Sequence, residues 1–186
     1  MADVKINNTR IAGIAACVPE NVDHIADYTL ISESERAGFM KTVGVHERRM
    51  VSKGVVTSDL CAQAAVHLMK KLEWDPSTIN ALVFVTQTSD YVIPSTSIIL
   101  QHRLGLPESC MAFDMNLGCS GYVVGLQVAS SLINPTGIRR VIFLAGDVSS
   151  INMSYHDKST YPLFGDAGSA TAIEYCENAP EAIFST

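Results

Sequence analysis

Two short runs of apolar, β-prone residues most constrain the fold of this chain. Residues Ala81–Thr86 have the sequence ALVFVT and residues Val141–Gly146 have the sequence VIFLAG, with no charged side chain in either run. A strand that is apolar at every position is expected where both faces of a sheet are covered. Segments with helical periodicity separate these runs along the chain. This alternation predicts a layered α/β fold.

The remaining elements fit the same alternation of strand and helix. We expect strands at Val4–Val18 (broken by Gly13), Ala112–Asn116 and Ala170–Tyr175, and helices at Ser32–Thr42, Thr57–Leu72, Pro94–Leu104 and Tyr122–Ile133. The strand Ala170–Tyr175 is predicted to be antiparallel or to lie at an edge. A further strand begins at Ala182, and the sequence ends inside it. We therefore expect the chain to be part of a larger protein.

Composition excludes several classes of function. The 186 residues include 13 Lys+Arg and 19 Asp+Glu, which gives a formal net charge of −6 and argues against a nucleic-acid surface. The apolar runs fall far short of the ~20 residues of a membrane-spanning helix, and the polar N-terminus does not resemble a signal peptide. Charged residues make up only 17% of the chain, below the roughly 25% of soluble domains. This deficit predicts that part of the surface is covered by a partner.

The five cysteines favour a reducing compartment. Their number is odd, no pair has CxxC spacing, and no Cys–His cluster has zinc-site spacing. We therefore expect free thiols in a cytoplasmic protein, with no disulfide framework and no metal site. Cys17, Cys61, Cys110 and Cys176 lie in or beside apolar stretches and are predicted to be small buried side chains.

Cys119 lies in a different setting, a predicted strand–turn–helix junction. The sequence FDMNLGCSG places it between Gly118 and Ser120-Gly121, just before a helix. Backbone N–H groups and the helix dipole at such a position stabilise an anion, so cysteines there ionise more readily than free cysteine. The same N–H groups can hold the oxyanion of a thioester under attack. The pattern thus predicts a nucleophile, and the alternative is a small residue that packs a tight turn.

The helix after Cys119 carries almost no charge, so we expect it to be buried on all sides. Its small residues Gly121, Gly125 and Ala129 recur every four positions, and we expect this stripe to pack against a second helix from outside the chain. Asp114, on the preceding strand, is predicted to form structural hydrogen bonds. His46 is predicted to be a solvated surface residue. His156 lies in the loop after the strand Val141–Gly146, from which it could approach a site, but a single loop histidine is expected to be incidental.

Five ordered motifs resemble the β-ketoacyl-acyl-carrier-protein synthase III family of the thiolase superfamily. They are AFDMNLGCSGYVVGL around Cys119, VGVHERR from Val43, TQTSDYVIPSTS from Thr86, Ala145-Gly146-Asp147, and LFGDAGSA from Leu163. The resemblance implies a thiolase-like fold, in which two duplicated halves build five αβαβα layers. Residues 1–186 would form the N-terminal half, with element order βαβαβαββ, and the C-terminal half would be absent. The uncharged helix would then pack against its twin in the other half.

The resemblance also implies an acyltransferase of the 3-oxoacyl-acyl-carrier-protein synthase III type in fatty acid biosynthesis. Cys119 would take an acyl group from acyl-CoA or another donor, and malonyl carrier protein would then condense with it in a decarboxylating Claisen reaction. The His and Asn that assist this step would belong to the other half, so the chain alone would accept an acyl group without condensing it. The family implies no cofactor beyond its substrates, a homodimer, a cytoplasmic location, and no membrane or nucleic-acid partner.

Three positions that match family substrate contacts depart from the usual residues. Thr42 and Gly38 occupy the places of an Arg and a Trp that clamp CoA adenine, and Lys158 replaces an Arg near the CoA entrance. Ile93 matches the residue that reaches the partner subunit's acyl pocket and limits chain length. These departures leave the acyl donor and chain length open. The alternatives are a 3-hydroxy-3-methylglutaryl-CoA synthase, a secondary-metabolite synthase, or a non-catalytic scaffold half.

Overall fold

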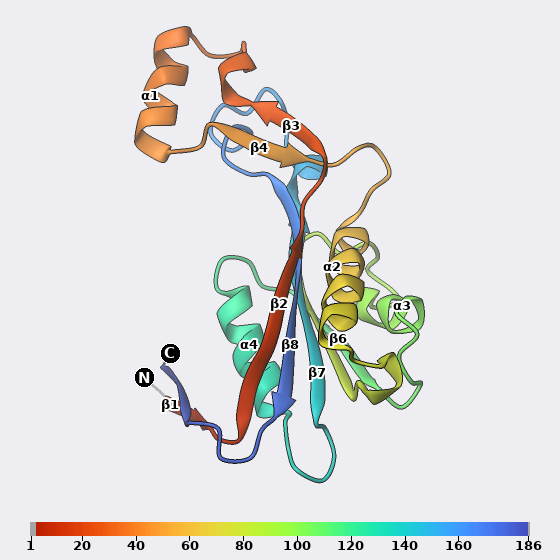
Figure 1. Cartoon of the computed structure of the whole chain (residues 1–186). Helices are drawn as coiled ribbons and strands as arrows, with labels where there is room; N and C mark the ends of the chain where they lie inside the picture. Colours follow the sequence, from red (N-terminus) through yellow and green to blue (C-terminus); the bar gives the residue numbers. More distant parts are fainter. Residues whose placement is uncertain (1–2, 186) are drawn as a thin grey trace.

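The computed structural model describes residues 3–185 (Figure 1). Its strands are β1 (Asp3–Ile6), β2 (Thr9–Cys17), β3 (Asn21–His24), β4 (Glu47–Met50), β5 (Ala81–Val85), β6 (Met111–Met115), β7 (Arg140–Val148), β8 (Asp166–Tyr175) and β9 (Ala182–Ser185). Its α-helices are α1 (Glu33–Val43), α2 (Thr57–Leu72), α3 (Thr96–Arg103) and α4 (Gly121–Ser131). The predicted helices therefore agree with the structure to within two residues at each end.

A five-stranded mixed sheet in the order β2-β8-β7-β5-β6 forms the centre of the molecule. Strand β5 is parallel to β6 and β7, whereas β8 is antiparallel to both of its neighbours, β2 and β7. Helices α2 and α3 cover one face of the sheet and α4 covers the other (Figure 1). The order β2-α2-β5-α3-β6-α4-β7-β8 confirms the predicted α/β fold and its βαβαβαββ pattern.

The two faces of the sheet hold separate apolar cores. On one face, α2 places Cys61, Leu68 and Met69 against sheet residues that include Phe84 and Ile142. The other core is smaller and lies under α4. All five residues of β5 are buried, which accounts for its uninterrupted apolar sequence.

The small-residue stripe of α4 faces its own sheet, so the prediction that it meets an outside helix was wrong. A Cβ added at Gly125 would lie 2.6 Å from Phe143 Cε2, and one at Gly121 would lie 2.7 Å from Val85 Cγ1. Glycine is needed at both positions because the helix lies directly on these strands. The free face of α4 instead carries Val123, whose side chain is 59% exposed, so α4 is not buried on all sides in the described chain.

The structure corrects one strand prediction, extends a second and adds a hairpin. The single predicted strand Val4–Val18 is two strands in different sheets: β1 pairs with β9, while β2 pairs with β8 and has a register shift between Ile11 and Gly13. Strand β8 starts at Asp166 and lies inside the sheet, so it is antiparallel but not an edge strand. The β3–β4 hairpin was not predicted, because NVDH and ERRM are too polar to show an apolar alternation.

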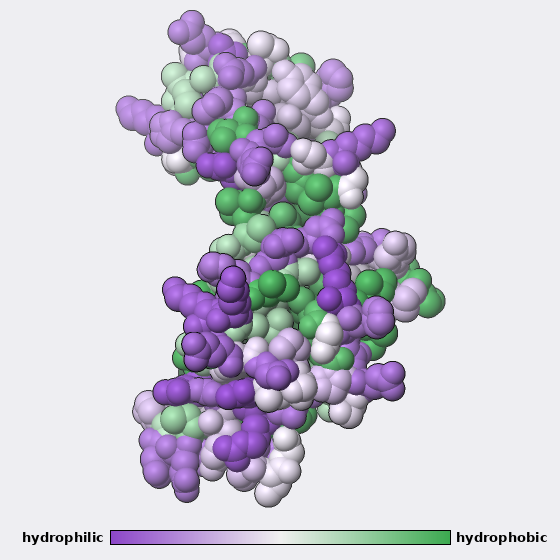
Figure 2. Space-filling model, turned by 45° about the vertical axis from the view of Figure 1, so that its right-hand side comes forward, coloured by the Kyte–Doolittle hydropathy of each residue, from purple (hydrophilic) through white to green (hydrophobic). Residues whose placement is uncertain are grey.

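The hairpin β3–β4, helix α1 and the loop 149–165 form a separate lobe at one end of the sheet, which we call the hairpin lobe (Figure 1). Buried Arg48 on β4 ties this lobe together, donating hydrogen bonds to the carbonyls of Tyr161 and Phe164 and pairing with Asp23. Apolar surface gathers at the narrow waist between the lobe and the body (Figure 2). Among residues 3–185, no helix is both long and apolar enough to cross a membrane.

Candidate active site

Cys119 lies in the turn between β6 and α4, at the carboxyl end of the central parallel strands. The turn is closed by a hydrogen bond from the Gly121 N–H to the Gly118 carbonyl at 2.7 Å. Ser120 directly precedes the helix, and its side chain makes no capping hydrogen bond. The first N–H groups of a helix have no partner within it. The Gly121 N–H is used by the turn, but those of Tyr122 and Val123 have no acceptor among residues 3–185 and remain available to an anion. The Cys119 side chain itself is exposed.

An open cavity of about 390 Å³ lies beside Cys119. It is formed by the β6–α4 turn, by the carboxyl ends of β5 and β7, and by the segment that leads into β8. Its lining includes Cys119, Tyr122, Asp147, Phe164 and Ser169. The junction predicted from sequence is therefore present, and its cysteine faces a space that a small acyl group can enter.

Asp147 organises the wall of this cavity at the end of β7. Its Oδ1 accepts hydrogen bonds from Thr86 Oγ1 at 2.9 Å, from the Gln87 N–H at 2.8 Å and from Thr88 Oγ1 at 2.9 Å. This carboxylate thereby holds the segment that leaves β5. The Gln87 side chain reaches the cysteine turn, since a Cβ at Gly118 would lie 2.6 Å from Gln87 Oε1.

The hairpin lobe supplies the opposite wall of the cavity. Phe164 and Gly165 line the cavity, and the Phe164 carbonyl accepts a hydrogen bond from Arg48 at 3.0 Å. Next to them, the buried Asp166 carboxylate accepts from the Val51 N–H at 2.8 Å and the Ser150 N–H at 2.9 Å. The lobe is therefore fixed to the rim of the site by polar contacts.

The remaining predicted site residues lie outside this cavity. Ile93 is 86% exposed on the loop before α3. Thr42 is exposed on α1 and Lys158 is exposed on the loop 149–165, so both belong to the hairpin lobe. Hydrogen bonds from Ser32 hold the pKa of Glu35 on α1 below its ordinary value, and the charge of Lys158 contributes to this lowering to a smaller extent. The substrate roles expected for these residues remain predictions.

None of the described residues that line the cavity is a histidine. All five histidines, including His46 and His156, are exposed. Asp114 accepts hydrogen bonds from the Thr96 and Ser97 N–H groups, both at 2.8 Å. This contact agrees with the structural role predicted for Asp114, since it anchors the first turn of α3 to β6.

The other cysteines differ from Cys119 in their environment. Cys61 is buried under the sheet, and burial raises the pKa of its thiol to about 12. Burial likewise raises the pKa of the Cys110 thiol to about 11. Cys17 and Cys176 are half-buried. Among residues 3–185, no group of three or more His, Cys, Asp and Glu side chains is arranged to hold a metal ion.

Sequence reasoning missed the residues that shape the cavity without carrying its chemistry. Asp147, Arg48 and Asp166 lie inside motifs that the family resemblance had already marked. Their roles depend on contacts with segments up to 116 residues away, such as the bond from Arg48 to Phe164. Spacing along a single sequence does not reveal such pairings.

The chain combines a mixed α/β sheet with a cysteine at the junction of β6 and α4. The family model for 3-oxoacyl-[acyl-carrier-protein (ACP)] synthase III matches residues 113–186. A β-ketoacyl-[acyl-carrier-protein] synthase III of Phocaeicola vulgatus is 33% identical over 168 residues, which cover 90% of this chain and 50% of the relative. The corresponding protein of Xylella fastidiosa is 32% identical over 169 residues, covering 91% and 52%.

Solved structures give the same result. A 3-oxoacyl-(acyl-carrier protein) synthase from Burkholderia xenovorans superimposes with a TM-score of 0.95 at 37% identity, covering 98% of this chain and 52% of that one. A synthase III from Aquifex aeolicus has a TM-score of 0.81 at 26% identity, covering 89% and 53%. These matches confirm the resemblance to the β-ketoacyl-acyl-carrier-protein synthase III family. The chain spans about half the length of the curated relatives it matches.

Proposed function

We propose that this chain is the acyl-accepting half of a synthase III-type condensing enzyme, with Cys119 as its nucleophile. The observation that carries the proposal is the position of Cys119. Its exposed thiol lies at the uncapped start of α4, beside a cavity of about 390 Å³. A thiol in this position combines a helix dipole, free N–H groups and access for a substrate.

In the proposed first step, the Cys119 thiolate attacks the carbonyl carbon of an acyl thioester. A new bond forms between Sγ and this carbon, and the carbonyl oxygen becomes an oxyanion that the N–H groups of the turn stabilise. The bond between the carbon and the leaving sulfur then breaks. The donor departs as a thiolate, which takes up a proton from water, and the acyl group remains on Cys119.

We propose that the second step needs residues from the other half of the protein. Malonyl carrier protein would lose CO₂, and the resulting carbanion would displace Sγ from the acyl carbon, which forms the new carbon–carbon bond. The family resemblance assigns this step to a His and an Asn of the other half. The exposure of all five histidines of this chain supports that division. The proposed chemistry uses acyl thioesters and carrier protein, with no cofactor.

We propose a homodimer in which Ile93 reaches the partner's acyl pocket. Tyr91, Val92 and Ile93 are 57%, 95% and 86% exposed, an unusual apolar run for a free surface. Strand β6 lies at one end of the described sheet, so its outer edge is open to pairing with another strand. A branched aliphatic at position 93 would admit a different range of acyl chains from an aromatic. The five free thiols support a cytoplasmic location.

Release of CoA tests the proposal. The chain is incubated with acetyl-CoA and longer acyl-CoAs, and free CoA is measured by chromatography. We expect up to one CoA per chain, no release by Cys119→Ser, and normal release by the matched control Cys176→Ser. Addition of malonyl carrier protein is expected to give no β-ketoacyl product. Sustained condensation by this chain would overturn the assignment of the second step to the other half.

The absence of CoA release would also distinguish between the alternatives. If neither acyl-CoA nor acylated carrier protein acylates the folded chain, the scaffold alternative is favoured.

Substitutions at Thr42 and Lys158 provide a second experiment, because we propose that these residues lie near the donor's entrance in the hairpin lobe. Thr42→Arg and Lys158→Arg restore the family residues. If the natural sequence is adapted to a donor other than CoA, these substitutions are expected to raise the rate at which acyl-CoA acylates Cys119.

A further inference from the structure

A second cavity, of about 380 Å³, adjoins the cavity beside Cys119, and we call it the side cavity. Asp147, Ser149 and Phe164 line both cavities, so the two meet at the end of β7. The side cavity is further lined by Gln87, Thr88, Asn152, Met153 and Thr160. It therefore lies between the segment that leaves β5 and the loop 149–165 of the hairpin lobe.

Four polar groups that line the side cavity make no hydrogen bond with residues 3–185. They are the carboxamides of Gln87 and Asn152, the hydroxyl of Ser149 and the second carboxylate oxygen, Oδ2, of Asp147. Only Oδ1 of Asp147 is used, by the three donors described above. The side cavity thus offers one charged acceptor together with three groups that both donate and accept.

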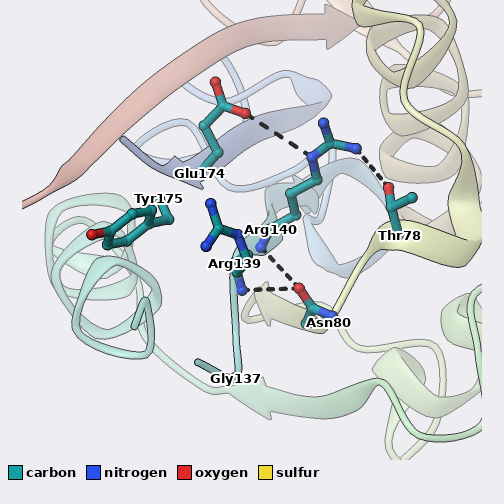
Figure 3. Close-up of a pocket in the computed structure, with 7 residues that line it drawn as sticks. All are labelled: Thr78, Asn80, Gly137, Arg139, Arg140, Glu174 and Tyr175. Carbon is teal, nitrogen blue, oxygen red and sulfur yellow. Dashed lines mark hydrogen bonds and ion pairs between the residues drawn. The ribbon is translucent and has the colours of Figure 1, made fainter. Parts of the chain in front are cut away.

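The pocket at the other end of the sheet has its polar groups paired instead (Figure 3). Thr78 Oγ1 accepts a hydrogen bond from the Arg140 guanidinium at 2.8 Å, and Asn80 Oδ1 accepts one from the Arg140 backbone N–H at 3.0 Å. The Glu174 carboxylate accepts two hydrogen bonds from Arg10. Those groups satisfy one another, whereas the groups of the side cavity are left for water or a ligand.

Two of the free groups are held beside the cysteine turn. Three donors orient the Asp147 carboxylate through Oδ1, which fixes the place of Oδ2. The Gln87 carboxamide reaches Gly118, the residue before Cys119, since a Cβ at Gly118 would lie 2.6 Å from Gln87 Oε1. An acyl group on Cys119 would therefore meet polar groups that are already in place. Such preorganisation lowers the entropy cost of binding.

This lining disfavours an acyl group made only of hydrocarbon. Such a group would displace water from Asp147 Oδ2 and from the carboxamides without replacing the hydrogen bonds, and each buried group left unpaired costs about 1–3 kcal/mol. A hydroxyl can donate to a carboxylate oxygen and accept from a carboxamide at the same time. Met153 and Phe164 add apolar contacts for a short carbon chain.

We propose that the side cavity selects a short acyl group that carries a hydroxyl, which donates to Asp147 Oδ2 and accepts from the Gln87 carboxamide. This selectivity rests on the proposed function, in which Cys119 accepts an acyl group from a thioester, and it names the substrate class of that step. The bonds that form and break are those of the acyl transfer, and the hydroxyl is unchanged. A site that hydrogen-bonds a substrate hydroxyl discriminates strongly against the analogue without it.

The acylation rates of two matched thioesters test the inference. The chain is incubated separately with the 3-hydroxybutyryl and the butyryl thioester of N-acetylcysteamine, and acylation of Cys119 is followed by mass spectrometry against time. We expect the 3-hydroxybutyryl thioester to react at least about ten-fold faster. Gln87→Met keeps the side-chain length and the backbone bond to Asp147, and it is expected to lower this ratio at least about three-fold.

A matched control makes the same change elsewhere. Gln63 is exposed on α2 and lines neither cavity, so Gln63→Met is expected to keep the ratio of the natural chain. Equal rates for the two thioesters would overturn the inference and leave the proposed function standing. An equal loss of the ratio in Gln87→Met and Gln63→Met would overturn it as well.

A binding measurement tests the inference without acyl transfer, and it applies even if neither thioester acylates Cys119, a result that would count against the proposed function. The side-chain N–H signals of Gln87 and Asn152 are followed by NMR as 3-hydroxybutyramide or butyramide is added to the chain. We expect saturable shifts with 3-hydroxybutyramide and none with butyramide. Equal shifts with both amides, or no shift up to about 50 mM of either, would overturn the inference.

Discussion

At the scale of single residues, the environment of each cysteine decides its reactivity. Cys119 is exposed, whereas Cys61 and Cys110 are buried and their thiol pKa values are raised to about 12 and about 11. Only the thiolate form attacks an alkylating agent. At neutral pH the two buried thiols therefore stay protonated, and the alkylating agent cannot reach them.

We accordingly expect iodoacetamide at pH 7.5 to modify Cys119 well before Cys61 or Cys110. Peptide mass mapping against time measures the order of modification. Cys119→Ser should remove the fast phase and leave the slow phases unchanged. Modification of Cys61 at a rate similar to that of Cys119 would contradict the burial described here.

The raised pKa of Cys61 also makes stability depend on pH. A thiol ionises near pH 8.5 in the unfolded chain, whereas the folded chain holds the Cys61 proton to about pH 12. The stabilisation is therefore fully present below about pH 8.5 and is lost as the pH rises toward 12. We expect the free energy of unfolding in urea to fall by on the order of 1–2 kcal/mol between pH 8 and pH 10 from this group. Cys61→Ala should show a smaller fall over the same range.

At the scale of secondary structure elements, close packing fixes α4 on the sheet. A Cβ at Gly125 would lie 2.6 Å from Phe143 and 2.8 Å from Val85, both of which are side chains of the buried core. We expect Gly125→Ala to lower the free energy of unfolding by about 1–3 kcal/mol, because the sheet has no room for the added methyl group. Urea denaturation measures the change.

A matched glycine on another helix provides the control. Gly38 lies in α1, and a Cβ there would meet no atom within 4 Å. Gly38→Ala is expected to be neutral or to stabilise the chain by up to about 1 kcal/mol, since alanine favours a helix more than glycine does. Equal destabilisation by both substitutions would contradict the close contact of α4 with β5 and β7.

Asp114 is expected to stabilise α3 through the first turn of that helix. The Asp114 carboxylate accepts hydrogen bonds from the N–H groups of Thr96 and Ser97, which have no partner within the helix. We expect Asp114→Ala to cost about 1–2 kcal/mol in urea denaturation, the range typical of a lost helix cap. The same substitution at exposed Asp27 should change stability by less than about 0.5 kcal/mol.

Elements with a strong apolar pattern could be predicted from sequence, and elements held by polar contacts could not. Strand β5 and helix α2 were predicted correctly because the local pattern of apolar residues indicates which of their side chains are buried. The stripe of Gly121, Gly125 and Ala129 was recognised, but its packing partner was predicted wrongly. Close packing on a sheet requires the same small residues as close packing on a helix. The β3–β4 hairpin was missed because it depends on Arg48, whose partners lie far along the chain.

At the scale of the whole molecule, Arg48 links the hairpin lobe to the rim of the Cys119 cavity. Its guanidinium contacts the Tyr161 and Phe164 carbonyls and Asp23. We expect Arg48→Met to cost about 2–3 kcal/mol, because it leaves polar groups without their charged donor. Hydrogen exchange should rise in the loop 149–165 and in β3. Unchanged exchange there would show that Arg48 does not hold the lobe.

The chain has few charged residues, and several of its large apolar residues are exposed. Val92, Ile93 and Val123 are more than half exposed, although valine and isoleucine side chains are usually buried in folded proteins. The chain spans about half of its curated relatives. The proposed second half and partner subunit would cover these positions, in agreement with a charged fraction of only 17%.

Mass spectrometry of an acyl adduct tests the central claim most directly. The folded chain is incubated with a series of acyl thioesters, and both the intact mass and the peptide that contains Cys119 are measured. The account predicts one acyl group per chain, attached to Cys119, labile to hydroxylamine and absent from Cys119→Ser. The account would be contradicted if no thioester acylated the folded chain, or if the label were distributed equally between Cys119 and Cys176.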